Sequence, residues 1–298
     1  MASQPLKQWQ ATLIGATAIL MWATLALLTD LSGNIPPFQL TAMSFTVAFF
    51  VGILTWIKDK QNPLQCLQLP KAVWALGIAG LFGYHLFYFI ALQNAPVVEA
   101  SLIAYLWPLL IVFFSALLPG EKLRWFHCAG AIAAFVGVTL LVTKGQSLSF
   151  EAQYTTGYLA ALVCAITWSS YSLLSRRLGN IPTNAVGGFC AATAILSWIF
   201  HFLLEPTLWP VGNAWVAVFC LGAGPVGLAF FTWDHGVKHG NIKILGVLSY
   251  MAPLLSTVLL VLYGLAQATW TLGIACLLII GGALLASADF SKKRRSSL

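Results

Sequence analysis

The sequence predicts an all-α integral membrane protein whose ten transmembrane helices form two inverted-topology five-helix repeats around a central cavity. Three observations favour this fold: an apolar composition, ten apolar runs of membrane-spanning length, and a sequence repeat at half the chain length. Of the 298 residues, 59% are apolar and only 8% are charged. A soluble protein carries about 25% charged residues, so lipid must surround most of this chain, whose mean hydropathy is +0.86.

The ten runs are bounded by charged residues, prolines, glycines and asparagines. A bilayer core takes about 20 helical residues per crossing, so ten crossings leave only short loops and tails, and no soluble domain fits. The first run is longer than the apolar core of a typical secretory signal and lacks a clear cleavage site, so we expect it to be retained. In chain order the predicted spans are 9–29, 38–57, 72–93, 97–118, 125–143, 157–177, 185–204, 214–235, 242–264 and 268–288.

The positive charges divide unequally between the two sides of this predicted bundle. Fourteen of the 15 Lys and Arg residues fall in alternate loops and at the two tails, and only Lys144 lies opposite. Cytoplasmic loops carry the excess of Lys and Arg, so both termini are predicted to be cytoplasmic. The net charge of +7 is therefore explained by the excess of cations on the predicted cytoplasmic side, and no nucleic-acid partner is expected. The 14 residues are Lys7, Lys58, Lys60, Lys71, Lys122, Arg124, Arg176, Arg177, Lys238, Lys243, Lys292, Lys293, Arg294 and Arg295.

The two halves of the chain match one another at an offset of 145 to 146 residues. Trp22 aligns with Trp168, Gly-Asn-Ile-Pro at 33–36 aligns with the same letters at 179–182, and Tyr-x-x-Pro-Leu-Leu at 105–110 aligns with 250–255. We therefore divide the chain into repeats 1–148 and 149–298. Because each repeat has five spans, the second must enter the membrane in the opposite orientation, an arrangement typical of carriers.

Inverted duplication predicts a substrate site near the bilayer centre, where helices are broken. Pro108 and Pro253 lie centrally in the fourth and ninth spans. Each removes a backbone hydrogen bond and bends its helix. We interpret them as hinges or cavity walls; a packing kink without ligand contact is the alternative.

Polar aromatic residues at mid-depth are the candidate substrate-binding residues. A phenol or imidazole that faces lipid leaves its polar group unsatisfied, so these side chains should face the interior. Each alone could be an ordinary hydrogen-bonded core residue, but together they predict a cavity lined with rings. Ser249, beside Tyr250, is expected to face the same cavity. The candidates are Trp22, Tyr84, His85, Tyr88, Tyr105, Trp107, Trp168, Ser249 and Tyr250.

His85 is the one histidine near mid-membrane. It could couple transport to protons, or, as a neutral ring, hydrogen-bond a substrate or a neighbouring helix. No acidic residue lies at mid-depth, which argues against a site for a bare cation. The sequence shows no metal-ligand spacing, no paired carboxylates and no nucleophile beside a base, so we expect no catalytic residue, metal or cofactor, and no enzyme activity.

An Ala-Pro-Val-Val-Glu-Ala segment at 95–100, leading into Trp107-Pro108-Leu109, joins the ten spans and two inverted halves. In these features the whole chain resembles the EamA-type carriers of the drug/metabolite transporter superfamily, and within it the YddG-type aromatic amino acid exporters. The resemblance implies a multi-pass protein of the bacterial inner membrane that exports aromatic and other neutral amino acids. Alternatives are a carrier of another small neutral metabolite or drug, and a proton-coupled antiporter that uses His85.

The expected mechanism is alternating access, with bending at Pro108 and Pro253 and with facilitated efflux favoured over proton exchange. The expected partners are the small-molecule substrate and membrane lipid. We expect a monomer, with a dimer through the tenth-span glycines as the alternative.

Overall fold

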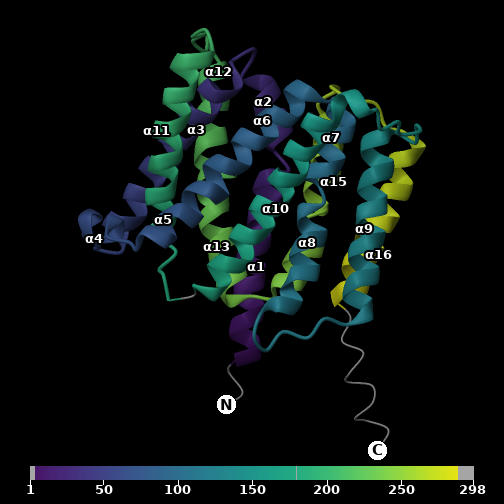
Figure 1. Cartoon of the computed structure of the whole chain (residues 1–298), viewed down its shortest axis with the longest axis horizontal. Coiled ribbons are helices and arrows are strands. Elements are labelled where there is room, and N and C mark those ends of the chain that lie inside the picture. The colour runs from purple at the N-terminus through teal and green to yellow at the C-terminus, as the bar shows by residue number, and fades with distance from the viewer. Residues whose placement is uncertain (1–3, 179, 288–298) are drawn as a thin grey trace, which may run out of the picture.

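The computed structural model describes residues 4–178 and 180–287, and its regular secondary structure within these ranges is helical (Figure 1). The described residues contain ten stretches long and apolar enough to cross a membrane, which confirms the predicted number of spans. Their ends agree with the predicted ranges to within a few residues. They are Lys7–Leu31, Pro37–Lys58, Lys71–Asn94, Val97–Leu117, Trp125–Thr143, Ala152–Arg177, Ala185–Leu204, Ala214–His239, Ile242–Leu262 and Trp270–Ser287.

Several spans consist of more than one helix. In the first half the helices are α1 Gln4–Trp22, α2 Leu25–Leu31, α3 Pro37–Lys58, α4 Pro63–Leu67, α5 Lys71–Ile78, α6 Tyr84–Asn94, α7 Val97–Ala104, α8 Trp107–Phe114 and α9 Trp125–Thr143. In the second half they are α10 Thr155–Arg177, α11 Ala185–Leu204, α12 Ala214–Ala223, α13 Ala229–His239, α14 Ile242–Leu248, α15 Met251–Leu262 and α16 Trp270–Ser287. Short 3₁₀ turns at Ser115–Leu117 and Ala152–Tyr154 extend α8 and precede α10.

The two predicted proline positions are interruptions in the structure. The ring of a proline clashes with the carbonyl group four residues earlier. For Pro108 that residue is Ala104, where α7 ends, and for Pro253 it is Ser249, directly after the end of α14. Each span is thus interrupted just before its proline, whereas bending or movement about these breaks stays a prediction.

Two further interruptions, which the sequence analysis did not anticipate, also lie at equivalent places. π-Helical segments at Ala79–Gly83 and Gly224–Leu228 join α5 to α6 and α12 to α13, 145 residues apart. A third break, at Ala23 and Thr24 between α1 and α2, has no counterpart, because α10 runs unbroken through the matching stretch. There the backbone N–H and hydroxyl of Thr24 both donate to the Met21 carbonyl, which tightens the turn.

Helices from the two halves interleave rather than forming separate bundles. α1 packs on α13 and α6 on α10; α3 packs on α11, α8 on α14 and α9 on α16. In Figure 1, α3 and α11 stand at one edge, α9 and α16 at the other, and α1, α8, α10 and α13 lie between them. Counted by whole spans, exchanging the halves leaves this pairing unchanged, as the predicted inverted repeat requires, although the inversion itself stays a prediction.

Glycine pairs allow three of these helix pairs to approach closely. A Cβ atom on Gly15 of α1 would lie 2.8 Å from the Cα atom of Gly236 on α13. The same spacing separates a Cβ on Gly52 of α3 from the Cα of Gly187 on α11, and Gly282 of α16 meets α9 in a similar way. Small residues are what bring helix backbones together in membranes. Gly282 therefore makes a helix contact within the protein. A Cβ atom on Gly273 or Gly281 would meet no neighbouring atom of the described residues.

The beginning of α1 and the end of α16 lie at the same end of the bundle (Figure 1), as an even number of crossings demands. We call this the terminal end, and the other the distal end. The basic tail at 292–295 lies outside the described residues. At the distal end the Glu205 carboxylate accepts hydrogen bonds from the backbone N–H groups of Phe38 (2.9 Å) and Gln39 (3.1 Å), and so caps α3 from the other half.

Candidate functional site

Four tryptophans from four helices form a cluster, which we call the tryptophan quartet. Trp22 of α1, Trp107 of α8, Trp168 of α10 and Trp233 of α13 are in mutual contact, and all six centroid distances lie between 5.1 and 6.3 Å. Most of the contacts are edge-to-face, the arrangement aromatic rings prefer. The structure thus unites three of the predicted residues and adds Trp233, which is 0% exposed.

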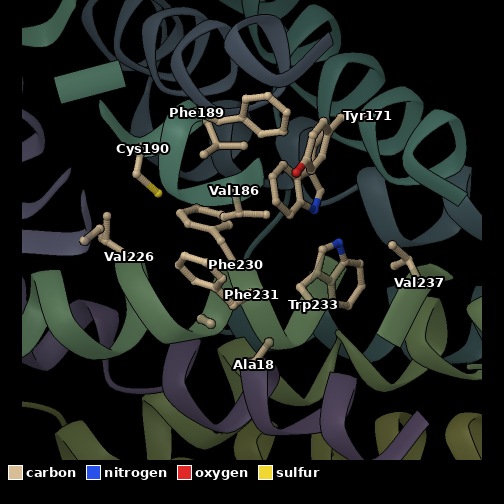
Figure 2. Packing of buried hydrophobic residues seen from close by; sticks show 14 of the residues in the cluster. Ala18, Tyr171, Val186, Phe189, Cys190, Val226, Phe230, Phe231, Trp233 and Val237 are labelled. Carbon is tan, nitrogen blue, oxygen red and sulfur yellow. The ribbon is translucent and has the colours of Figure 1, made fainter. Parts of the chain in front are cut away.

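Two indole N–H groups of the quartet are bonded across the bundle. The Nε1 of Trp22 donates to the carbonyl of Pro225 at 3.1 Å, and that of Trp233 donates to the hydroxyl of Ser172 at 3.1 Å. Figure 2 shows Trp233 projecting from α13 toward Tyr171 of α10. The quartet is therefore the centre of a packed interface between the halves.

A polar wall extends from the quartet along α6. The ring of Tyr84 lies 5.7 Å from that of Trp168 and stacks on Tyr88 at 6.1 Å. The Tyr88 hydroxyl is 3.4 Å from the Ser101 hydroxyl on α7, and Tyr105 lies close to Tyr88. Tyr84, Tyr88 and Tyr105 keep part of their surface exposed although they lie deep in their spans. Tyr84 and Tyr88, joined to the quartet, form one continuous group of rings, and Tyr105 lies near its end.

His85 lies beside this wall but points toward α3. Its ring meets Phe45 edge-to-face at 5.2 Å and Tyr84 at 5.4 Å. Its Nδ1 is 2.7 Å from the Leu81 carbonyl, and because a carbonyl only accepts, Nδ1 carries the proton. In the neutral ring Nε2 is then left as an acceptor.

Both π-helical segments have a carbonyl that accepts from a ring nitrogen. A π turn interrupts the regular i to i−4 hydrogen bonds, and such turns are frequent at functional sites. The Leu81 carbonyl accepts from His85 of the same span, while the Pro225 carbonyl accepts from Trp22 of the other half. The two segments directly precede α6, which carries the polar wall, and α13, which carries Trp233.

The structure does not bring Ser249 and Tyr250 into this group. The Ser249 hydroxyl donates to the Leu245 carbonyl at 2.8 Å, and Tyr250 is 0% exposed. Tyr250 packs against Phe135 of α9, with ring centroids 6.2 Å apart. Ser249 was expected to face the cavity, but its hydroxyl bonds the preceding turn of its own helix, as serines in helices commonly do.

Ion pairs join the halves at the terminal end, where Glu121 is the centre of what we call the ionic network. The Glu121 carboxylate, in the loop after α8, accepts from Arg176 at 2.6 Å and from Lys243. Arg176 also donates to the carbonyls of Val237 (2.9 Å) and Gly240 (2.7 Å) at the end of α13. Burial raises the pKa of Glu121, but the hydrogen bond from Lys243 and the charges of Lys243 and Arg176 outweigh it, so the pKa is below its ordinary value.

A second buried ion pair lies in α13 at the same end. Lys238 donates to Asp234 at 2.7 Å and to the Ile181 carbonyl at 2.9 Å, and the Thr183 hydroxyl donates to Asp234 at 2.7 Å. Buried charges persist only when paired and hydrogen-bonded, and these are. From sequence alone the cations marked topology and gave no sign that they pair across the halves. At the terminal end, ion pairs therefore join the first half of the chain to the second.

The grouped side chains offer stacking surfaces, hydroxyls and one imidazole. The predicted residues that come together are Trp22, Tyr84, His85, Tyr88, Tyr105, Trp107 and Trp168, and Trp233 is the addition. Within the described ranges, no three His, Cys, Asp or Glu side chains are grouped so that they could hold a metal ion. Such a group suits a small neutral or zwitterionic molecule with an apolar part.

Residues 9–143 and 155–288 each match the EamA-like transporter family. The chain is 55% identical over 278 residues to the aromatic amino acid exporter YddG of Ancylobacter novellus, a match that covers 93% of this chain and 96% of that protein. It is 26% identical to the aromatic amino acid exporter YddG of Escherichia coli K12, with 93% and 96% covered. A solved crystal structure superposes with a TM-score of 0.89 at 55% identity, and covers 93% of this chain and 97% of that one.

Proposed function

Because this chain belongs to the EamA-like transporter family, we propose that it exports amino acids, especially aromatic and other neutral ones, across the bacterial inner membrane by alternating access. The observation that carries the proposal is the continuous group of rings, built by helices of both halves and free of formal charge apart from the imidazole of His85. The family and the similar proteins are transporters, and we assign this chain no reaction of its own.

The substrate's side chain would stack on the rings next to Trp168. Stacked and edge-to-face aromatic pairs stabilise a contact by about 1 kcal/mol beyond their buried area. The hydroxyls of Tyr84, Tyr88 and Tyr105 would hold the ammonium and carboxylate groups, and Nε2 of His85 would accept from the ammonium group. A zwitterion has no net charge, so a site without a fixed carboxylate or guanidinium matches it.

The transport cycle would use the interruptions that the halves share. We assign residues 1–148 and 149–298 to the two inverted repeats and place both termini in the cytoplasm, which makes the terminal end the cytoplasmic one. In this cycle the ionic network and the quartet would close that side when the site faces away from the cytoplasm. Bending at Pro108 and Pro253 would separate α8 and α14 there and open the site to the cytoplasm. We assign this cycle to a monomer.

Reconstituted liposomes test the proposal directly. We expect labelled tryptophan to exchange across the membrane, phenylalanine and tyrosine to compete, and lysine and glutamate to compete weakly. Empty liposomes and the Trp168→Ala variant are the controls. Exchange of labelled lysine or glutamate as fast as that of tryptophan, or the absence of tryptophan exchange in a correctly inserted protein, would contradict the assignment.

A further inference from the structure

A cavity of about 220 Å³ lies between α8 with its 3₁₀ turn and the second half of α10. It shares no lining residue with the aromatic group. Ser170 and Arg177 are its polar lining residues, seven positions apart on α10, or about 10 Å along the helix. The apolar lining consists of Phe114, Leu117, Leu118, Leu173 and Leu174.

The cavity is a groove on the outer face of the bundle. Leu118 and Leu173, its floor, are buried, whereas Leu117 is 72% exposed and Leu174 is 42% exposed. In a protein whose spans cross a bilayer, exposed leucines of this kind face acyl chains. The groove is thus open to lipid along its length.

Arg177 lies at the mouth of the groove, at the last position of α10. The neighbouring Arg176 is fully engaged with Glu121 and the carbonyls of α13. Arg177 is exposed, and its side chain has no ion pair or hydrogen bond with another of the described residues. No acidic residue among those described lines the groove. Within the described part of the chain, the mouth therefore offers the Arg177 guanidinium without a protein partner, at the level where the span ends.

We propose that this groove binds one anionic phospholipid, with an acyl chain against Leu118 and Leu173 and the phosphate at Arg177. Guanidinium groups bind phosphate through paired N–H donors, and basic pockets between transmembrane helices on the cytoplasmic side recognise anionic headgroups. A free amino acid fits less well, because no lining carboxylate would take its ammonium group. Only the choice of leaflet rests on the orientation proposed above.

Native mass spectrometry of the full chain in mild detergent tests this, with phosphatidylglycerol and phosphatidylethanolamine of identical acyl chains as probes. We expect one tightly retained phosphatidylglycerol per chain and little phosphatidylethanolamine. Arg177→Gln should weaken its retention about tenfold, as expected for a lost charged hydrogen bond, and Arg177→Lys should restore part of it. Lys58→Gln, which removes an exposed cation from the last turn of α3 outside the groove, is the matched control.

A second variant fills the groove without touching the charge. Ser170→Phe should lower the retention of phosphatidylglycerol even though Arg177 remains. Equal retention of the two lipids by the wild type would overturn the proposal, as would equal losses in Arg177→Gln and Lys58→Gln. Lipid retention is measured without substrate, so a chain that keeps the lipid but does not exchange tryptophan contradicts the proposed function and leaves the lipid site standing.

Discussion

The stretches that follow the two π-helical segments share a backbone and differ in chemistry. After Ala79–Gly83, the third span presents Tyr84, His85 and Tyr88, all partly exposed. At the equivalent positions 145 residues later, the eighth span presents Ala229, Phe230 and Trp233, all buried. One wall can therefore meet a polar ligand, whereas the other is packed into the quartet. The two stretches thus share their π-helical start and differ in the polarity and exposure of the side chains that follow it.

Trp168 touches both walls, so its loss should have the largest effect on transport. Its ring lies 5.7 Å from Tyr84 and 6.2 Å from Trp233. We expect Trp168→Ala to abolish tryptophan exchange in liposomes while the protein still inserts. Trp215→Ala, which removes a half-exposed ring of α12, should leave exchange unchanged. Equal exchange rates in the two variants would show that transport does not depend on the contacts of Trp168 with Tyr84 and Trp233.

Trp233→Ala should destabilise the packed quartet. Removing a fully buried tryptophan leaves a cavity, and such truncations lower the free energy of unfolding by about 3 to 5 kcal/mol. Thermal unfolding of the purified variant in detergent measures this. Trp209→Ala, at an exposed ring of the distal end, is the control and should unfold like the wild type. If Trp233→Ala were as stable as that control, the quartet would not be a packed seal.

Glu121→Gln should weaken the ionic network at the terminal end. The change leaves Arg176 and Lys243 without their carboxylate, and hydrogen bonds to charged groups are each worth about 2 kcal/mol. The folded-state pKa of Glu121 is lowered, so its stabilisation is complete above the ordinary value of 4.5 and is lost as the pH falls through the folded-state pKa.

The pH dependence of unfolding checks the sign. On acidification through this range, the wild type should lose more stability than Glu121→Gln, whereas Glu151→Gln, at an exposed carboxylate of the distal end, should follow the wild type. Parallel curves for the wild type and Glu121→Gln would rule out the ionic network as a pH-dependent fastening.

His85→Phe would make the binding wall resemble its counterpart, which has Phe230. The Leu81 carbonyl would lose its partner, and one polar contact to substrate would vanish, so we expect exchange to fall about threefold to tenfold. Exchange by the wild type should be the same with and without a pH gradient. A gradient-dependent wild-type flux that disappears in His85→Phe would instead identify a proton-coupled antiporter.

Ser249→Ala should have the smallest effect. Its hydroxyl is bonded to Leu245 within α14 and is buried, away from the polar wall. We expect exchange within about twofold of the wild type, since only one intrahelical hydrogen bond is lost. A larger loss of exchange, with unfolding unchanged, would indicate that Ser249 contacts the substrate, as the sequence analysis predicted.

The features that were predictable from sequence are those fixed locally. Bilayer thickness sets the length of each apolar run, and the proline ring breaks its own helix, so ten spans and the breaks before Pro108 and Pro253 were foreseeable. The π-helical segments and the break at Ala23 and Thr24 depend on how neighbouring helices pack. Only the segment Gly224–Leu228 carries a local signal, since it contains Pro225.

The candidate site was predicted in part for the same reason. Ring type and depth identified Trp22, Trp107 and Trp168, but Trp233 lies toward one end of its span and was missed. The repeat carried a signal that could have found it, because Trp233 aligns with Tyr88. Tyr250 was grouped with the site through its alignment with Tyr105, yet one tyrosine lies at the polar wall and the other against α9. Alignment fixes a position along a helix and leaves its surroundings open.

The interleaved helix pairs also set an order of events during synthesis. α1 must be in the membrane long before its partner α13 is translated, and α6 must wait for α10. Until then, Trp22 and Tyr84 lack the ring contacts that Trp168 of α10 supplies, and Trp22 also lacks Trp233 of α13. We therefore expect the first five spans to be incompletely packed on their own, and to gain the contacts of the quartet only when the second half has been inserted.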